Sequence, residues 1–188
     1  MSKSKIFIIS GPSGVGEDSV IAGLNRYIDV EIVKTTTTRS MREGESQGHP
    51  YYFISQDEFQ KKLHNDELAE YAQQYNGNFY GVTKEELERV ANSGKIGLWK
   101  IEYKGVITAK EKFPEIKSIY IAAPSLETLR QRILRRDPNV SENYLKERMD
   151  YTEEWMKHED IYDYKVVNEE SRLDETIQKV SQIIKTHF

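Results

Sequence analysis

Residues Gly11–Ser19, read Gly-Pro-Ser-Gly-Val-Gly-Glu-Asp-Ser, have the glycine spacing of a phosphate-binding loop. They follow an apolar run at 6–9 and precede a helix-like stretch, which is the context in which G-x-x-x-x-G-K-[ST] holds phosphates through backbone N–H groups. Three glycines let the N–H groups turn inward as an anion nest. The sequence therefore predicts phosphate binding by Gly11, Pro12, Ser13, Gly14, Val15, Gly16, Glu17, Asp18 and Ser19.

The charge of this loop is inverted. Glu17 occupies the position of the usual lysine, and Asp18 occupies that of the usual hydroxyl. Two like charges about 5 Å apart repel by about 3 kcal/mol at an effective dielectric of 20. A cation from elsewhere in the chain must offset these carboxylates, or a polyphosphate does not bind. A carboxylate is also a better ligand for a hard cation than a hydroxyl, so Asp18 is predicted to bind Mg²⁺ directly.

A second group of anion-binding residues lies in the segment 35–44, Thr-Thr-Thr-Thr-Arg-Ser-Met-Arg-Glu-Gly. Arg39 and Arg42, three residues apart beside a row of hydroxyls, suit a phosphate monoester held by charge-assisted contacts. Taken alone, the segment is better explained as a β-branched strand that runs into a basic turn than as a phosphate site. With a phosphate loop upstream, a second phosphate site is the better interpretation.

The elements that must position these groups alternate along the chain. Four apolar runs, at 5–10, 96–102, 116–123 and 164–168, read as buried strands. Helical patterns lie between and after them, at 105–113, from Ser125 onward and at 173–185. This alternation predicts an α/β fold with βα units and a parallel core sheet.

Residues 35–93 have a different character. Tyr51–Ile54 is strand-like, and Asn76-Gly77 is a hairpin signal. Capping boxes at Ser55–Glu58 and Thr83–Glu86 predict two helix starts. The chain is thus expected to form a single domain, with a core at 1–34, 94–126 and 163–188, a mixed α+β insertion at 35–93 and a charge-rich helical segment at 127–162.

Composition narrows the class of protein. The 188 residues fit one domain, with 31% charged and 37% hydrophobic residues as in ordinary soluble chains. A net charge of −4 argues against nucleic acid as a partner. The chain has no cysteine for disulfide or thiolate chemistry, and its four histidines lack metal-ligand spacing. The apolar runs are too short for a membrane span and a strand is predicted close to Met1, so we expect no signal peptide and a cytoplasmic protein.

The order of several motifs resembles the guanylate kinase family over nearly the whole chain. The matching segments are Ile9-Ser-Gly-Pro-Ser-Gly14, Thr37-Thr-Arg-x-x-Arg-x-Gly-Glu45, Tyr51-Tyr-Phe53, Glu70-Tyr-Ala-Gln73, Asn78-Phe-Tyr-Gly81, Gly105-Val106, Ile121-Ala-Ala-Pro-Ser125 and Val166-Val-Asn168. No single segment is decisive, whereas their order and spacing together are highly specific.

The resemblance implies a three-layer P-loop kinase fold with a GMP-binding insertion and a helical lid. It implies the reaction ATP + GMP ⇌ ADP + GDP with Mg²⁺. It places the GMP phosphate at Arg39, Arg42, Tyr51 and Tyr80, the guanine at Glu70 and Thr35, and further substrate contacts at Glu102. It assigns ATP contacts to the lid residues Arg132, Arg136 and Arg148 and to Asn168 near the adenine.

Lys100 is the most informative departure, because the family usually has an acidic residue at that position. The C-terminal ends of parallel strands face one crevice, so Lys100 is expected beside the phosphate loop. We expect it to replace the missing lysine, either by reaching the phosphates or by pairing with Glu17. Lys104 is a weaker second choice. The catalytic set predicted from the sequence is Lys100, Arg39, Arg136 and Arg148.

Two alternatives stay open at this point. The altered loop is also compatible with a catalytically inactive guanylate-kinase-like module that binds nucleotides or proteins. The second alternative is an active kinase with a different acceptor, resembling a ribose bisphosphate kinase. Glu70 and Thr35, however, favour guanine as the acceptor base. The oligomeric state does not follow from the sequence.

Overall fold

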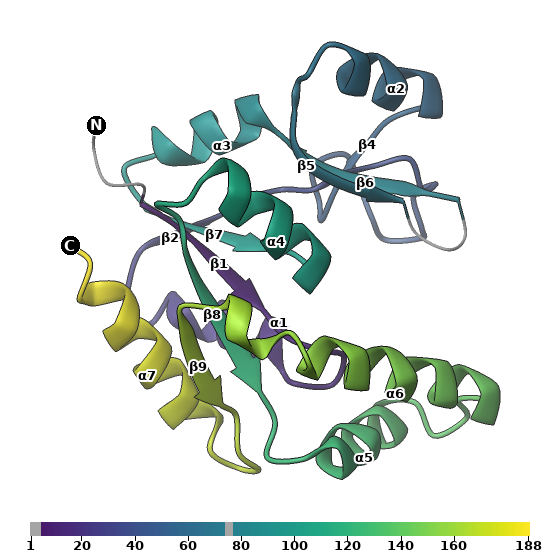
Figure 1. Ribbon diagram of the computed structural model, residues 1–188, viewed down its shortest axis with the longest axis vertical. Helices are drawn as coiled ribbons and strands as arrows, with labels where there is room; N and C mark the ends of the chain where they lie inside the picture. The colour runs from purple at the N-terminus through teal and green to yellow at the C-terminus, as the bar shows by residue number, and fades with distance from the viewer. Residues whose placement is uncertain (1–4, 74–76) are drawn as a thin grey trace.

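A five-stranded parallel sheet forms the core of the computed structural model, which describes residues 5–73 and 77–188 (Figure 1). Every pairing in this sheet is parallel, and the strand order is β2-β7-β1-β8-β9. The strands are β1 (Ile6–Ser10), β2 (Val30–Ile32), β7 (Ile96–Lys100), β8 (Lys117–Ala122) and β9 (Tyr164–Val167). The predicted α/β fold with a parallel core sheet is confirmed.

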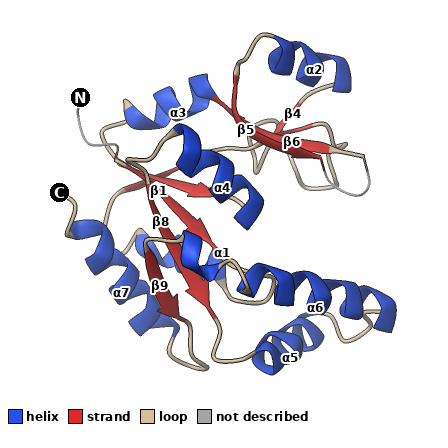
Figure 2. Ribbon diagram, in the orientation of Figure 1, coloured by secondary structure: helices blue, strands red, loops and turns tan. Residues whose placement is uncertain are grey.

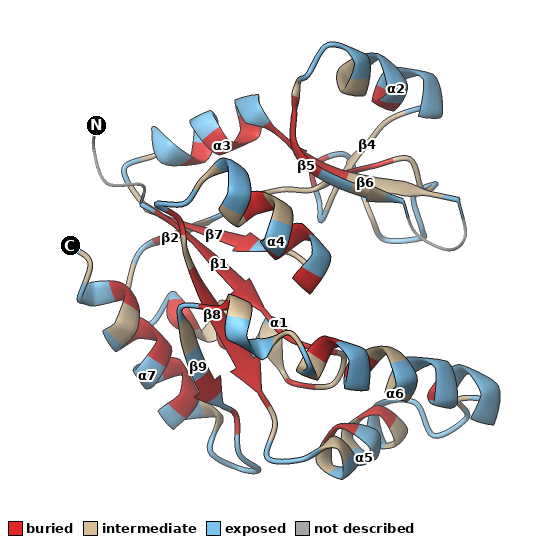
Figure 3. Ribbon diagram, viewed as in Figure 1, coloured by how far each residue is buried: buried red, intermediate tan, exposed pale blue. Residues whose placement is uncertain are grey.

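Helices cover both faces of this sheet (Figure 2). Phe7 and Ile9 point to the face covered by α1 (Glu17–Leu24) and α7 (Leu173–Lys185). Ile6 and Ile8 point to the other face, which packs against α4 (Tyr103–Lys112). Because successive side chains of a strand alternate between faces, an all-apolar β1 supplies both layers of the core. All five residues of β1 are buried (Figure 3).

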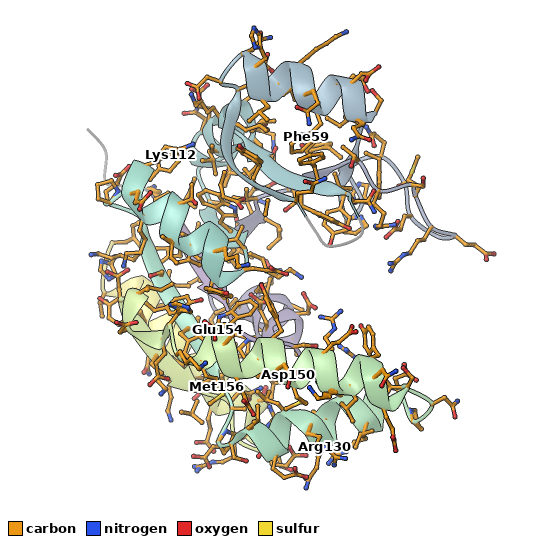
Figure 4. All side chains as sticks on the ribbon, turned by 45° about the vertical axis from the view of Figure 1, so that its right-hand side comes forward. Phe59, Lys112, Arg130, Asp150, Glu154 and Met156 are labelled. Atoms are coloured by element: carbon orange, nitrogen blue, oxygen red, sulfur yellow. The ribbon has the colours of Figure 1, made fainter. Side chains whose placement is uncertain are left out.

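A second, four-stranded sheet lies within residues 35–93. Its order is β4-β3-β6-β5, from β3 (Thr36–Thr37), β4 (Tyr52–Phe53), β5 (Leu68–Gln73) and β6 (Phe79–Thr83). Strands β3 and β4 are parallel, and the other pairs are antiparallel. Helix α2 (Gln56–His64) packs on this sheet through Phe59, whose ring stacks on Phe79 with centroids 5.1 Å apart (Figure 4).

The two predicted capping boxes differ in outcome. At α2, Ser55 accepts from the Glu58 backbone N–H while Glu58 accepts from the Ser55 N–H, so this box is confirmed. At α3 (Lys84–Ala91), Thr83 accepts from the Glu86 N–H. The Glu86 carboxylate does not return the bond, because it accepts instead from Arg89 and from the Lys34 N–H. The second box is therefore wrong as a reciprocal pair.

The segment 127–162 is helical, as predicted. Helix α5 (Leu126–Arg136) and helix α6 (Glu142–Met156) are followed by a 3₁₀ turn, Glu159–Ile161. Their N-caps, Ser125 and Ser141, accept hydrogen bonds from backbone N–H groups in the first helical turn. These helices and the second sheet project to the same side of the parallel sheet, from opposite ends (Figure 1).

Several boundaries differ from the sequence-based expectation. Strand β7 ends at Lys100 instead of Glu102, because Glu102 is the N-cap of α4, which begins at Tyr103 before the predicted start at Gly105. Of the hairpin signal, Asn76 lies outside the described residues, whereas Gln73 of β5 pairs with Phe79 of β6 on either side of it.

Among residues 5–73 and 77–188, no helix is both long and apolar enough to cross a membrane.

Candidate active site

The glycine-rich loop connects the C-terminal end of β1 to the N-terminus of α1. Gly16 has φ 89°, a left-handed conformation that L residues rarely adopt, and a Cβ there would lie 2.7 Å from the Asn168 amide nitrogen. A Cβ on Gly11 would lie 2.5 Å from the Ile121 carbonyl oxygen. These positions require glycine, so the loop brings its backbone to the end of the sheet in the arrangement that favours anions at a helix N-terminus.

The side-chain amide of Asn168 fixes the glycine-rich loop by a hydrogen bond. Its Nδ2 donates to the Val15 carbonyl at 2.8 Å, and its Oδ1 accepts from Thr176 of α7 at 3.1 Å. Arg132 donates to the same Val15 carbonyl at 3.3 Å and to the Asn168 carbonyl at 2.9 Å. The carbonyl of Val15 is thereby satisfied by two side chains, which fixes the backbone of the glycine-rich loop.

The loop, the end of β7, the second sheet and the α5–α6 segment enclose one cavity of about 770 Å³. The structure brings together in its lining most of the residues predicted from the sequence: Gly11, Pro12, Ser13, Gly14, Val15, Gly16, Glu17, Asp18, Ser19, Thr35, Arg42, Tyr51, Glu70, Tyr80, Lys100, Glu102, Arg132, Arg136 and Arg148. Arg39 and Asn168 lie behind this surface, where they contact lining residues.

The second sheet contributes an aromatic and basic wall. The rings of Tyr51 and Tyr80 meet edge to face with centroids 5.9 Å apart. Arg39 lies over the Tyr51 ring, 5.6 Å from its centroid, and forms an ion pair with Glu45 at 2.8 Å. The Arg42 side chain, in contrast, is exposed to the cavity and makes no hydrogen bond or ion pair within the described part of the chain.

Glu70 is a buried carboxyl at the floor of this wall. Burial, reinforced by the nearby Glu102 carboxylate, raises the pKa of Glu70 to about 7. A Cβ on Gly105, in the first turn of α4, would lie 2.8 Å from Glu70 Oε1. Gly105 therefore makes room for this carboxyl, a role that its sequence position did not reveal. In the sequence, Gly105 stood out only as the first residue of a predicted helix and as part of the Gly105-Val106 segment that matches the family.

The inverted loop has an unexpected pairing. Lys100 Nζ donates to Asp18 Oδ1 at 2.6 Å, so its ion-pair partner is Asp18 and not Glu17. Glu17 Oε1 is buried without a hydrogen-bond partner in the described structure. Burial raises the pKa of Glu17 to about 8, against the lowering effect of Lys100. Glu17 is consequently mostly protonated at pH 7, and the local charge is that of the Asp18–Lys100 pair.

The α5–α6 segment supplies cations from the opposite wall. Arg148 donates to the Tyr144 hydroxyl at 2.9 Å and also lies over that ring, while Arg136 ends α5 beside the cavity. Tyr151 of the same segment donates to Glu102 at 2.7 Å. The lid helices thus contact the core at the end of β7, through a tyrosine that the sequence analysis did not single out.

The residues present fit a magnesium ion bound together with a nucleotide. The described residues contain no group of three or more His, Cys, Asp or Glu side chains that could hold a metal alone. Mg²⁺ in nucleotide sites is commonly held by one or two carboxylates plus substrate phosphates. Asp18, with its carboxylate exposed beside the phosphate loop, provides such a partial donor set.

A parallel sheet with a glycine loop after its first strand, and with a second sheet and a helical lid around one cavity, defines a P-loop nucleotide kinase. The family model described as guanylate kinase matches residues 3–187, and the chain belongs to this family. It is 35% identical to a guanylate kinase of Clostridium tetani, over 98% of this chain and 86% of the relative. It is 36% identical to one of Buchnera aphidicola, over 92% of this chain and 84% of the relative.

A solved structure has the same fold. The crystal structure of guanylate kinase from Anaplasma phagocytophilum superposes with a TM-score of 0.74 at 29% identity, covering all of this chain and 87% of that one. The similarity thus extends over the core sheet, the insertion and the lid.

Proposed function

We propose that this protein transfers the terminal phosphoryl group of ATP to GMP, giving ADP and GDP. The observation that carries the proposal is that one cavity is lined on one side by a phosphate-binding loop and on the other by Arg42, Tyr51, Tyr80 and Glu70. Two anion-binding regions that face each other suit a donor and an acceptor that both carry phosphate. Membership of the guanylate kinase family supports the same reaction.

The chemistry requires positioning and charge neutralisation more than a side-chain nucleophile. A phosphate oxygen of GMP attacks the γ-phosphorus of ATP, and the bond between that phosphorus and the bridging oxygen of ADP breaks. The N–H groups of the loop and the start of α1 would hold the ATP phosphates. Mg²⁺ supplies further neutralisation of the phosphate charge when it is bound, and Asp18 would hold it.

The acceptor side has groups for both ends of GMP. Arg42, Tyr51 and Tyr80 line the cavity where they can hold the phosphate, and Arg39 is placed to orient Tyr51 from behind. Glu70, when ionised, accepts hydrogen bonds from the N–H groups of the guanine edge. Thr35 lines the same end of the cavity and can donate its hydroxyl to the guanine carbonyl. Glu102 also lines the cavity and can provide a further substrate contact.

The lid arginines complete the charge balance. Arg136 and Arg148 line the cavity opposite the acceptor wall, so they are suited to neutralise the charge that spreads over the transferred group. Arg132 fixes the phosphate loop through the Val15 carbonyl while remaining on the cavity surface. Closure of the lid and of the second sheet would exclude water from the reacting phosphates.

The test measures ADP formation by the full chain with ATP and Mg²⁺, using GMP, AMP or ribose 1,5-bisphosphate as acceptor. We expect turnover with GMP and far slower turnover with AMP, because the buried acceptor groups would be left unpaired. Binding of GMP and ATP without turnover would instead establish a non-catalytic module. Preference for the bisphosphate would assign a different acceptor to the same fold.

A further inference from the structure

Lys100 is brought to the phosphate loop by the register of the sheet. It is the last residue of β7, and it pairs with Ile9 of β1, two residues before Gly11. Its ammonium lies 2.6 Å from the carboxylate of Asp18, in the first turn of α1. The N-terminus of α1, where the glycine-rich loop favours phosphate, therefore has a lysine beside it. This lysine belongs to the neighbouring strand β7.

We propose that Lys100 performs the phosphate-binding role of the missing loop lysine, exchanging its contact with Asp18 for a contact with the phosphates of ATP. This inference deepens the proposed function and rests on it. Lys100 is then a catalytic residue that belongs to β7, whereas the position that a lysine usually occupies in such loops holds Glu17.

The exposure of the ion pair permits this exchange. The side chain of Lys100 is 42% exposed and that of Asp18 is 85% exposed, so solvent screens their attraction and the pair is weak. A polyphosphate presents several anionic oxygens at the same helix N-terminus, and these compete effectively for the ammonium. Release from Lys100 also leaves the Asp18 carboxylate available to a hard cation.

Other cations near the loop are less well placed for this role. Lys104 lines the cavity, but its ammonium lies over the Tyr103 ring, 5.9 Å from the centroid. Arg132 is engaged by the carbonyls of Val15 and Asn168 and by the carboxylate of Glu170. The position of the usual lysine itself offers no cation, because it holds Glu17, whose Oε1 is buried without a partner in the described residues. Lys100, in contrast to Lys104 and Arg132, has an ion-pair partner, Asp18, that is exposed and lies next to the loop.

The test compares Lys100→Met with the wild type in ATP binding by isothermal titration, with EDTA and without GMP. We expect ATP affinity to fall at least tenfold, while GMP affinity stays within twofold. Lys95→Met is the matched control, because it removes a lysine just before the other end of β7 whose ion-pair partner, Asp29, is likewise exposed. That control should bind ATP like the wild type. Lys100→Arg should retain part of the affinity and of the turnover.

Asp18→Asn separates a direct role of Lys100 from an indirect one. If Lys100 only positioned Asp18, both substitutions would weaken ATP binding equally, and this would overturn the inference. If Lys100 binds phosphate, Asp18→Asn leaves ATP affinity in EDTA unchanged or improved. Restoring the usual arrangement, Glu17→Lys with Lys100→Asp, should recover turnover better than either single substitution, as expected for coupled neighbouring charges.

Two failures are distinguishable. Wild-type binding and turnover in Lys100→Met would end the role of Lys100 while the kinase function stands. Absence of GMP-dependent ADP formation in the wild type would end the proposed function itself. Thermal melts of each variant check folding, and Lys100→Gln provides a second neutral variant if Lys100→Met does not fold.

Discussion

The hydroxyl of Tyr151 donates to the carboxylate of Glu102 at 2.7 Å and so links lid helix α6 to the residue that caps α4. Glu102 lies two residues beyond Lys100, the last residue of β7, and it lines the cavity. Helix α6 is therefore hydrogen-bonded to the rest of the domain. It is connected to the core at the point where a carboxylate is predicted to contact substrate.

Tyr151→Phe tests the strength of this link. Hydrogen bonds to charged groups contribute about 1.5–3 kcal/mol when well shielded, and partial exposure reduces this. We expect the free energy of unfolding to fall by about 1 kcal/mol in urea denaturation. Tyr144→Phe, on the same helix, is the control, since its hydroxyl contacts only the exposed Arg148 among the described residues and should change stability by less than about 0.5 kcal/mol. Equal effects of the two substitutions would contradict a specific link.

Arg42→Ala should weaken GMP binding. The guanidinium lines the cavity and has no partner within the described residues, so its loss removes a substrate contact without breaking an internal one. A charge-assisted contact of about 1.5–3 kcal/mol corresponds to a loss of at least tenfold in affinity, measurable by calorimetry. Arg135→Ala, which removes an exposed arginine paired with Glu170, should leave GMP affinity unchanged. An unaltered affinity in Arg42→Ala would remove this residue from the site.

GMP affinity should depend on pH through Glu70. Burial raises the pKa of this carboxyl to about 7 in the unliganded protein, and only the ionised form accepts both guanine N–H groups. Affinity should therefore rise as pH increases through 7, and it should be roughly tenfold weaker at pH 6 than at pH 8. Glu70→Gln should bind more weakly and retain only the small dependence due to the phosphate of GMP, whose second pKa is about 6. A wild-type profile parallel to that of Glu70→Gln would exclude the carboxyl as its origin.

Glu17 should make stability fall toward alkaline pH. Burial raises the pKa of Glu17 to about 8 in the folded protein, from an ordinary value of 4.5. The folded state thus keeps a proton that the unfolded state has lost, and the associated stability is present below about pH 4.5 and is lost as pH rises through 8. Glu17→Gln, which cannot ionise, should gain stability over the wild type by a few kcal/mol between pH 5 and pH 9. Urea denaturation at both values would show it, and a difference that does not change with pH would refute the burial of this carboxyl.

Local sequence patterns predicted four of the five parallel strands and most helices because the determinants were local, whereas the three-residue strand β2 (Val30–Ile32) was missed. The apolar residues of β1 and the Ser55–Glu58 box indicate their structures within a few residues. The site followed from motif order, which the family resemblance supplied. The pairing of Lys100 with Asp18 instead of Glu17 did not follow, since residues 82 positions apart were paired by side-chain rotamers that no local pattern encodes. The second capping box failed because the Glu86 carboxylate is used instead by Arg89, three residues on in the same helix, and by the distant backbone N–H of Lys34.

The amide of Asn168 joins two distant parts of the chain, since it bonds the Val15 carbonyl on one side and the Thr176 hydroxyl of α7 on the other. Helix α7, which contributes no residue to the cavity lining, thereby helps to hold the glycine-rich loop that borders the cavity. Substitutions that loosen α7 would then be detected as a loss of ATP affinity before any loss of fold. In a screen for temperature-sensitive variants, changes in α7 would be classed with those of the phosphate loop, although the two lie more than 150 positions apart in sequence.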